Sequence, residues 1–311
     1  MKAVLCIGCF VTAAAAADIS TTRLVSLGGD SLDAARLGRL IRGDDPNEIP
    51  IFGASKARYA YDPEILGPSF FNYGFDATSL DVLNVMLTFE LRKRSTQPIL
   101  IDLHHQGLHG VGDVRTYVPY VAEDEIAKLL VRERKMIWRY RIFGLRYFGL
   151  FDGYVKGAIS SRLRSDKRSR GFASEQNAKP SNASQFAANV EKRSKTVFHM
   201  GFDENQKRRL IELISSAPDR KFILTFCPLH RSWFATVSGE EDFLRELDEI
   251  ARLPNVHILD FSRDAYSDDQ FVDTGHLNAA GAAVFSRRLK AALQQLDLYG
   301  VRPVASVDGR R

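Results

Sequence analysis

The chain has 311 residues, 45% of them hydrophobic and 26% charged, so it is long enough to bury a sizeable core. The formal net charge of +5 is dispersed along the chain and does not by itself indicate nucleic-acid binding, while acidic polymers and lipid surfaces stay open as partners. One elaborated α/β domain and two small domains both fit this length, and the pattern along the chain favours one domain.

The first residues combine a lysine, an apolar run and a string of alanines. This order is typical of a secretory signal over residues 1–17, with cleavage near Ala17, and it predicts an exported protein of the periplasm or cell envelope. The apolar run is too short to span a membrane comfortably. The alternative is a buried first strand that ends in an alanine-rich helix.

The three cysteines give little evidence for a disulfide or a metal site. Cys6 and Cys9 lie inside the predicted signal, so export leaves Cys227 without an intramolecular partner. No second pair accompanies the C-x-x-C spacing, and we therefore expect neither a structural zinc nor any other cofactor.

Residues 18–48 are polar and charged and predict a connector or a short helical lead-in, so the ordered domain is expected to begin at Ile49 and to end near residue 296, before a tail at 297–311. Short apolar runs then alternate with helical patterns. The expected strands are 49–54, 69–73, 98–103, 221–226 and 256–260, and the expected helices are 79–94, 204–216, 240–253 and 279–296. This alternation predicts a three-layer α/β/α sandwich around a parallel sheet of about five strands.

An insertion at about 113–197 separates the two halves and contains no convincing strand. Residues 123–155 have a helical composition in which arginines alternate with aromatic residues, from Arg132 to Phe151. They are interpreted as a cap helix that packs its aromatic side chains on the domain, or as a helix lying on an anionic membrane. Residues 156–195 are rich in serine, asparagine and arginine and predict a mobile surface excursion. No nucleic-acid-binding motif accompanies the basic stretch.

Ser55 follows a predicted strand through the small residues Gly53 and Ala54. Small residues allow a sharp turn at the carboxyl end of a strand, where open α/β sheets bind ligands. Ser55 is therefore a candidate nucleophile, and the alternative is that it only caps the next helix.

Asp273 and His276 lie together just before the last predicted helix, for which Asn278 is a plausible N-cap. A serine hydroxyl needs an imidazole to accept its proton, and the imidazole needs a carboxylate to fix its tautomer. These residues are candidates for the base and the acid of a triad with Ser55. The alternative is a capping cluster around Asn278, with His276 on the surface.

Three segments together resemble the SGNH (GDSL-like) hydrolases: G-A-S at 53–55, N-Y-G at 72–74 and D-T-G-H-L-N-A-A-G at 273–281. The resemblance covers 49–110 and 221–293 and is strongest to secreted or membrane-anchored bacterial members that act in polysaccharide O-acetylation and teichoic-acid D-alanylation. It implies a flavodoxin-like fold, no metal, and an acyl-serine intermediate that is resolved by water or a sugar hydroxyl.

The resemblance also implies an oxyanion hole formed by the N–H groups of Ser55 and Gly74 and, in many members, an asparagine side chain of a third block. That asparagine is absent after the strand 98–103, where the chain continues with His104, His105, Gln106 and Gly107. The position favours one of the histidines or Gln106 as its replacement, with the alternative that they are exposed turn residues. Asn72 is a further candidate, or it only holds the turn before Gly74.

Two further segments lie where they could border the site: Arg58 and Tyr59 after the serine, and His230 and Arg231 after the strand 221–226. They are candidate contacts for an anionic or sugar ligand, with ordinary surface residues as the alternative.

The sequence therefore predicts a serine esterase or acyltransferase that acts on an acylated cell-envelope glycan or a small ester. The alternatives are a non-catalytic protein that binds a glycan or an envelope assembly partner, and a peripheral protein of the membrane surface.

Overall fold

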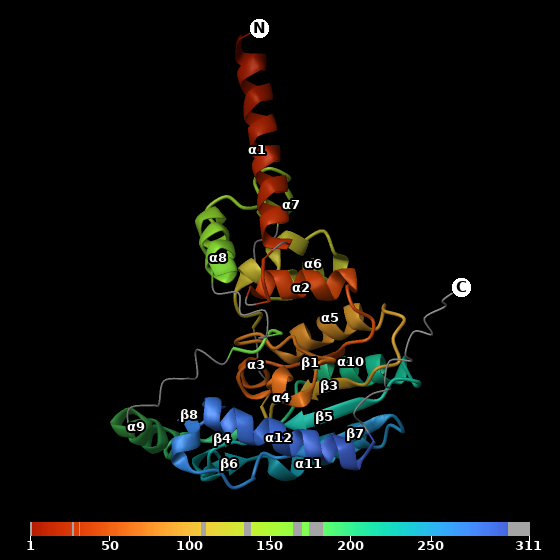
Figure 1. Ribbon diagram of the computed structural model, residues 1–311, viewed down its shortest axis with the longest axis vertical. Coiled ribbons are helices and arrows are strands. Elements are labelled where there is room, and N and C mark those ends of the chain that lie inside the picture. The colour runs from red at the N-terminus through yellow and green to blue at the C-terminus, as the bar shows by residue number, and fades with distance from the viewer. Residues whose placement is uncertain are drawn as a thin grey trace, which may run out of the picture.

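The centre of the molecule is a five-stranded parallel sheet with the strand order β2-β1-β3-β5-β7 (Figure 1). The structure is a computed structural model, and it describes residues 2–26, 28–30, 32–106, 110–133, 138–163, 170–173 and 183–297. The strands are listed in chain order: β1 (Ile49–Phe52), β2 (Phe70–Asn72), β3 (Ile99–Asp102), β5 (Phe222–Phe226) and β7 (Val256–Asp260). All four neighbouring pairs are parallel, as the alternation of strands and helices predicts.

Helices cover both faces of this sheet, and the pleat explains why. Along β3, Ile99 and Ile101 belong to one hydrophobic cluster and Leu100 belongs to the other. Because successive side chains of a strand point to opposite faces, a strand that is apolar at every position must be buried on both sides. The α/β architecture with a parallel central sheet is thus confirmed.

The first cluster includes side chains of α5 (Leu80–Glu90), α10 (Glu204–Ser215) and α11 (Glu240–Ala251). The second cluster includes side chains of the short helices α3 (Ser55–Ala60) and α4 (Pro63–Leu66) and of the last long helix, α12 (Ala279–Gln295). The four helices expected from the periodicity are present, each within a few residues of its predicted bounds. Asn278 caps α12 as predicted, because its side chain accepts hydrogen bonds from the N–H groups of Ala280 and Gly281.

The ordered body begins before Ile49, which corrects the expected start of the domain. Of the two interpretations of 18–48, the helices found there agree with the short helical lead-in and not with the connector. Helix α2 (Asp33–Arg42) packs against α5 and buries Leu37 and Leu40 completely. Arg36 is also buried, at 1% exposed, and donates to the carbonyl oxygens of Asn72 and Gly171. The charged residues of this segment suggested a solvated connector, but its cations make buried contacts that composition does not reveal.

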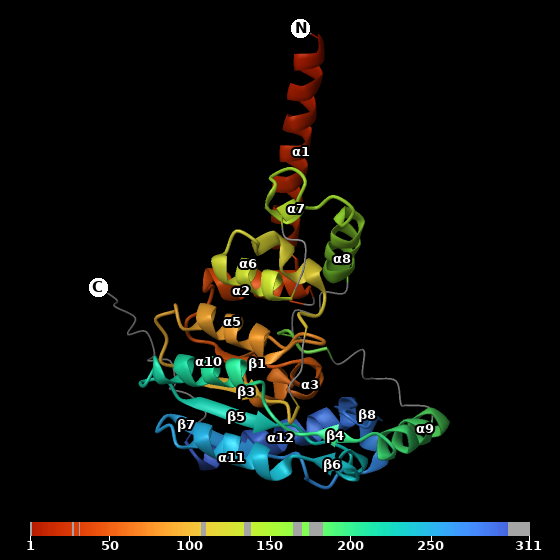
Figure 2. The same cartoon turned by 180° about the vertical axis from the view of Figure 1, so that it is seen from behind.

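The amino-terminal segment is one helix, α1 (Lys2–Ser26), so the alternative of a buried first strand is wrong. Its first half projects away from the body in both views (Figures 1 and 2). Its last turns are packed, with Thr21 and Val25 nearly inaccessible. Among the described residues, the model contains no helix with the length and apolarity needed to cross a membrane.

The insertion consists of separate helices rather than one long helix over 123–155. These are α6 (Asp124–Arg132), α7 (Trp138–Arg141), α8 (Phe151–Leu163) and α9 (Ala183–Ser194), with 3-10 turns at 114–116 and 118–120. Gly144 and Gly149 have φ values of 86° and 73° and produce turns between α7 and α8.

The predicted excursion at 156–195 is in part ordered structure. It includes the end of α8, helix α9 and residues 170–173, which lie against the sheet, since Asn72 donates its N–H to the carbonyl of Arg170 at 2.9 Å. The rest of that prediction, at 164–169 and 174–182, lies outside the described residues, as does the predicted tail from 298 onward.

Two small sheets complete the part of the fold that the model describes. Strands β4 (Phe198–His199) and β6 (Val237–Ser238) form a parallel pair. Strands β8 (Phe271–Asp273) and β9 (His276–Leu277) form an antiparallel hairpin that leads directly into α12. This hairpin carries both Asp273 and His276.

Candidate active site

Ser55 lies where β1 turns into α3, at the carboxyl edge of the sheet. Gly53 makes this turn with φ of 153°, and a Cβ atom there would come within 2.6 Å of the Ala57 side chain and 3.0 Å of the Asp102 Cβ. Only glycine therefore fits the approach of the strand to the helix. Ala54, and not Ser55, occupies the N-cap position, and no side chain caps this helix. The interpretation of Ser55 as a helix cap is wrong.

His276 lies beside Ser55, although the two residues are 221 positions apart in the chain. The distance between Ser55 Oγ and His276 Nε2 is 2.8 Å, which is hydrogen-bond length. Asp273 lies behind the imidazole, with its carboxylate oxygens 2.9 and 3.0 Å from Nδ1. The hydroxyl can thus donate to Nε2 while Nδ1–H donates to the carboxylate, which is the order of contacts in a serine hydrolase triad.

The hairpin itself fixes the carboxylate. Asp273 Oδ1 accepts hydrogen bonds from the N–H groups of Gly275 and His276 at 2.8 and 2.9 Å. Burial works toward a higher pKa of this carboxyl, but its hydrogen bond to His276 and the histidine charge outweigh burial and hold the Asp273 pKa below its usual 3.8. Asp273 is therefore ionised near neutral pH and can stabilise an imidazolium.

Asn72 and Gly74 do not contribute donors to this site, which corrects the expectation for both. The Nδ2 group of Asn72 donates to the carbonyl oxygens of Ala57 and Tyr61 at 2.8 and 2.9 Å. Asn72 Oδ1 accepts the N–H of Gly74 at 2.8 Å. Both side-chain hydrogens of Asn72 and the N–H of Gly74 are thus engaged, and the contacts of Asn72 match the alternative, that it holds the turn before Gly74.

Ser55, His276 and His104 line the same cavity, which we call the His276 cavity. It contains about 490 Å³ of space, part of it open to solvent. Its walls are mostly apolar and are completed by these residues: Lys56, His105, Gln106, Phe198, Leu229, Trp233 and Gly275. The cavity is large enough for part of a small organic substrate in contact with Ser55.

The three residues proposed to replace the missing asparagine have different surroundings. His105 is 4% exposed and packs among the rings of Phe226 and Phe243, and its Nδ1 atom also has no hydrogen-bond partner among the described residues. Gln106 is exposed. His104 is partly buried, and its Nε2 atom is enclosed without a hydrogen-bond partner among the described residues. An unpaired polar atom of this kind costs free energy unless a ligand or water satisfies it. His104 is the best placed of the three to donate into the His276 cavity.

Both histidines are neutral near neutral pH. Burial, followed by the charge of Lys56, lowers the pKa of His104 well below 6.5 and the pKa of His105 to about 2. A neutral His104 can carry a proton on Nε2 and donate it as a hydrogen bond without changing its charge.

Two residues near Ser55 were not singled out from the sequence. Lys56, the residue after the serine, is 7% exposed and lines the His276 cavity. Asp102, the last residue of β3, is 1% exposed and accepts hydrogen bonds from the Tyr61 hydroxyl at 2.8 Å and the Cys227 N–H at 3.1 Å. A charged residue at the end of an apolar strand was the available signal for Asp102, whereas nothing in the sequence distinguished Lys56 from a surface lysine.

The polar groups of Arg58 and Tyr59, two candidate substrate contacts, are engaged with carboxylates. Arg58 pairs with Asp33 and Asp76 at 3.2 and 2.9 Å, and Tyr59 donates to Asp76 while its ring lies edge-on to the ring of His276. Only Tyr59 of these two therefore flanks the triad.

In the loop after β5, His230 is 3% exposed and bonds Ser232 and Asp268. Arg231 points into solvent, with its side chain 86% exposed. Neither lines the His276 cavity, to which the same loop instead contributes Leu229 and Trp233.

The described residues contain no group of three or more histidine, cysteine or acidic side chains that could hold a metal ion. Cys9 is exposed and Cys227 is buried, and both are free thiols.

No family model and no curated protein matches this chain. Its function is therefore argued from the geometry of the site.

Proposed function

We propose that this chain is a serine esterase or acyltransferase of the SGNH kind, with Ser55 as nucleophile, His276 as base and Asp273 as the acid that orients it. The observation that carries the proposal is the 2.8 Å distance from Ser55 Oγ to His276 Nε2, with the Asp273 carboxylate 2.9 Å from Nδ1. The strand order, with two early strands exchanged and the rest sequential, agrees with a flavodoxin-like sheet whose ligands bind at the carboxyl edge.

In the proposed mechanism Ser55 Oγ attacks the carbonyl carbon of an ester while its proton moves to His276 Nε2. The resulting imidazolium is stabilised by Asp273 and then protonates the departing alcohol oxygen, leaving an acyl group on Ser55. A water molecule or a sugar hydroxyl next gives its proton to His276 Nε2 and attacks the carbonyl carbon of the acyl-serine. The bond from that carbon to Ser55 Oγ then breaks as His276 returns the proton to Oγ, and the acyl group leaves as an acid or as an ester of the sugar.

The negative oxygen of each tetrahedral intermediate needs hydrogen-bond donors. The N–H of Ser55 lies at the start of α3, where helical N–H groups have no intrahelical partner, and it donates to no acceptor among the described residues. We propose this N–H and His104 Nε2–H as the two donors of the oxyanion hole. They stand in place of the Gly74 N–H that the family resemblance implies and of Asn72, the further candidate. The buried charge of Lys56 adds a favourable electrostatic potential at the same place.

The proposed substrate is an acylated glycan of the cell envelope or a related ester. Trp233 and Phe198 line the His276 cavity and contact each other edge-on, with ring centres 4.7 Å apart. Flat aromatic surfaces suit the apolar faces of sugar rings and leave the hydroxyl groups in water. We also propose that the protein is exported, on the order of lysine, apolar run and alanines at residues 1–17.

The test is covalent labelling and hydrolysis by the purified protein. We expect a fluorophosphonate probe to label Ser55 and p-nitrophenyl esters to be hydrolysed, and Ser55→Ala to abolish both. The matched control is Ser216→Ala, because Ser216 lies at the end of α10 and its hydroxyl bonds only the nearby Leu213 carbonyl. Labelling and hydrolysis that persist in Ser55→Ala would refute the proposal.

The second candidate is a non-catalytic glycan-binding or envelope-assembly protein on the same fold. It is favoured by the engagement of Gly74 and Asn72, which leaves the oxyanion hole with fewer donors than the family pattern. Glycan pull-down with wild-type protein and Ser55→Ala separates the two candidates. Full glycan binding and full biological activity in the mutant would favour binding over catalysis.

We also propose that the insertion rests on an anionic membrane surface. Its tyrosines Tyr140 and Tyr147 are buried, as expected for a cap, but four other aromatic side chains are 51–83% exposed: Trp138, Phe143, Phe148 and Phe151. The same segment is tied to the base of α1, because the Gly144 N–H donates to Asp18 and Tyr147 bonds Thr22.

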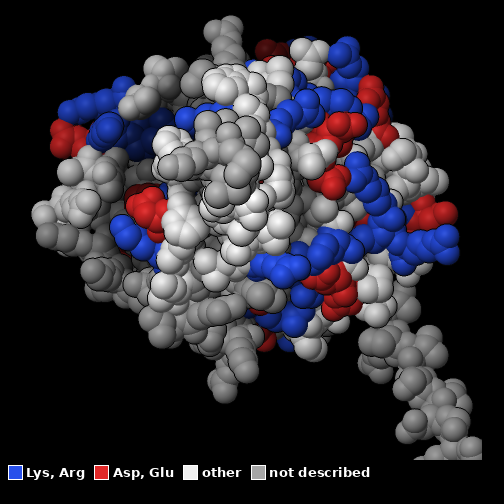
Figure 3. Space-filling view, turned by 90° about the horizontal axis from the view of Figure 1, so that it is seen from above, with Lys and Arg blue, Asp and Glu red and all other residues white. Residues whose placement is uncertain are grey.

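Figure 3 views this end along α1 and shows lysine and arginine side chains, with some acidic ones among them, around the middle of the face. Exposed aromatic residues with flanking cations are typical of membrane-surface segments. We expect the protein to float with phosphatidylglycerol vesicles at low salt, and Phe148→Ser to weaken flotation more than the control Leu244→Ser on α11. The absence of flotation at low salt would refute this placement.

A further inference from the structure

The hairpin that carries Asp273 and His276 marks the part of the His276 cavity that the alcohol of an ester occupies. In acyl transfer the imidazolium of His276 protonates the departing alcohol oxygen, so the alcohol lies beside this ring. Gly275, the residue before His276, lines the same cavity and has no side chain of its own. A group that faces Gly275 is therefore placed to contact the alcohol.

The group that faces Gly275 is the indole of Trp233. A Cβ atom at Gly275 would lie 3.5 Å from both Nε1 and Cζ2 of Trp233. Trp233 lines the His276 cavity and is partly buried, and its Nε1 atom is enclosed without a hydrogen-bond partner among the described residues. An indole N–H can only donate. Trp233 thus provides an unused donor next to the triad hairpin.

The neighbours of Trp233 hold the indole in this position. The guanidinium of Arg193 lies over the ring, 4.2 Å from its centre, and Arg193 donates to the Trp233 carbonyl at 3.1 Å. The Trp233 backbone N–H donates to the carbonyl of His230 at 2.8 Å. The His230 N–H in turn donates to the carbonyl of Thr274 at 3.1 Å, which ties this loop to the hairpin. A donor that is already fixed loses little conformational entropy when a ligand binds.

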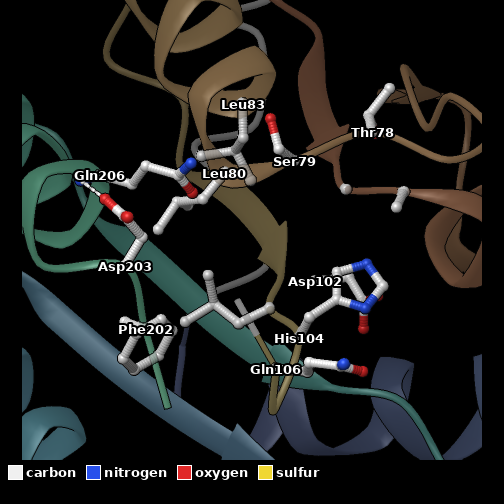
Figure 4. Close-up of a pocket in the computed structure, with 13 residues that line it drawn as sticks. Thr78, Ser79, Leu80, Leu83, Asp102, His104, Gln106, Phe202, Asp203 and Gln206 are labelled. Atoms are coloured by element: carbon white, nitrogen blue, oxygen red, sulfur yellow. Dashed lines mark hydrogen bonds between the residues drawn. The ribbon is translucent and has the colours of Figure 1, made fainter. Parts of the chain in front are cut away.

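The hollow next to the His276 cavity does not compete for the alcohol. It lies between the ends of β1 and β3 and the starts of α5 and α10, and it shares His104 and Gln106 with the His276 cavity. Figure 4 shows Leu80, Leu83 and Phe202 around it. This hollow has room for about one water molecule. A sugar ring does not fit there, which leaves the His276 cavity.

The chemistry of the indole selects the kind of alcohol. An enclosed N–H without a partner costs free energy that an oxygen acceptor recovers. A sugar offers such acceptors in its hydroxyl and ring oxygens, whereas a simple aliphatic alcohol has no oxygen besides the one in the ester bond. The face of the indole adds apolar contact area for the carbon atoms of the ring.

We propose that Trp233 determines the alcohol specificity of the site, because its Nε1–H donates a hydrogen bond to an oxygen of the alcohol other than the ester oxygen. The preferred alcohol is then a sugar or another polyol. The inference rests on the proposed function and specifies its substrate class. The bonds that form and break remain those of the proposed mechanism, and Trp233 binds the alcohol without taking part in proton transfer.

The experiment compares two acetate esters, 6-O-acetylglucose and ethyl acetate, by the release of acetate. Both form the same acetyl-Ser55, so a change in the ratio of their kcat/KM values reports the contacts of the alcohol. Trp233→Phe keeps an aromatic ring and removes the N–H. We expect it to lower the sugar-to-ethyl ratio about fivefold, the size of one neutral hydrogen bond. An unchanged ratio would overturn the inference.

Gly275→Ala tests the location of the alcohol. Its methyl group would be in ordinary contact with the indole at 3.5 Å, so it narrows this part of the cavity without a clash. We expect the sugar-to-ethyl ratio to fall on the order of tenfold, a loss typical of overpacking. The control Tyr266→Phe also removes one polar group from an aromatic side chain. Tyr266 contacts Phe271, does not line the His276 cavity, and should leave the ratio unchanged.

Fluorophosphonate labelling of Ser55 separates the possible failures. If Ser55 is labelled but Trp233→Phe lowers kcat/KM equally for both esters, the indole supports the triad and not the alcohol. In that case the specificity assignment is wrong and the proposed function stands. If neither ester is hydrolysed and Ser55 is not labelled, both are wrong. Thermal unfolding of each variant shows that the comparison is made on folded protein.

Discussion

Replacing Asn72 with alanine tests whether its amide serves the fold or the reaction. Asn72 is fully buried and makes three hydrogen bonds of 2.8–2.9 Å, to the carbonyls of Ala57 and Tyr61 and from the N–H of Gly74. Alanine would leave these three backbone groups without partners. Each buried group without a hydrogen-bond partner costs about 1–3 kcal/mol. We therefore expect the free energy of unfolding to fall by about 3–5 kcal/mol, which is near the lower end of the total for three such groups.

The rate should respond differently from the stability. If Asn72 only holds α3 and the turn before Gly74, kcat of the folded variant should stay within about tenfold of wild type. If the amide were an oxyanion donor, its loss would lower kcat on the order of 10²–10³-fold with stability nearly unchanged.

The assay combines urea unfolding, followed by tryptophan fluorescence, with hydrolysis of a p-nitrophenyl ester at low temperature. The matched control is Asn255→Ala, because Asn255 is also buried and its Nδ2 group bonds three backbone carbonyls at 3.0–3.3 Å. It should lose a similar free energy of unfolding and keep kcat. A stable Asn72→Ala variant with a hundredfold loss of kcat would refute the structural role.

Three other predictions concern the triad and the two histidines after β3. Asp273→Asn removes the negative charge behind His276 Nδ1 and introduces an amide that can favour the wrong imidazole tautomer, so we expect kcat to fall on the order of 10⁴-fold while far-ultraviolet circular dichroism is unchanged; a loss below tenfold would exclude Asp273 from the triad. His104→Ala should lower kcat on the order of 10²-fold and His104→Asn, which keeps a donor, by less; equal rates for both variants would count against an oxyanion contact. His105 has its pKa lowered to about 2 by burial, so the unfolded chain takes up its proton first as the pH falls below 6.5, and stability declines in that range. Between pH 6.5 and pH 5 this amounts to about 2 kcal/mol, and His105→Phe should reduce the acid sensitivity of urea unfolding by that amount; an unchanged pH dependence would contradict the buried neutral histidine.

Local sequence patterns were sufficient to predict the central sheet, its helices and the three triad candidates. Each strand of the main sheet is a short apolar run between polar turns, and each long helix repeats its apolar residues with helical spacing, so neither depends on distant contacts for its prediction. Ser55, Asp273 and His276 were identifiable because strand ends and helix starts can be located from sequence, and the carboxyl edge of a parallel sheet gathers them.

The burial of individual polar side chains depends on contacts between residues that are far apart in the chain. Composition made α2 resemble a connector, but Arg36 is buried because two carbonyl oxygens, of Asn72 and Gly171, are present to accept its hydrogen bonds. His104 and His105 are adjacent, line the same cavity and each have an unpaired ring nitrogen among the described residues, yet only the ring of His105 packs in the aromatic core, since successive residues leave the strand in different directions.

The sequence by itself predicted the layered α/β architecture, because this follows from local periodicity. It also predicted the proposed nucleophile, base and acid, which rest on residue chemistry together with the family resemblance. Only the tertiary structure decided which donors are free. A hydrogen bond uses a specific N–H group, so the bond from Gly74 to Asn72 removes the donor that the family resemblance implies, and the unpaired Nε2 of His104 is the group we propose in its place. That choice depends on distances between atoms far apart in the chain, which no local pattern encodes.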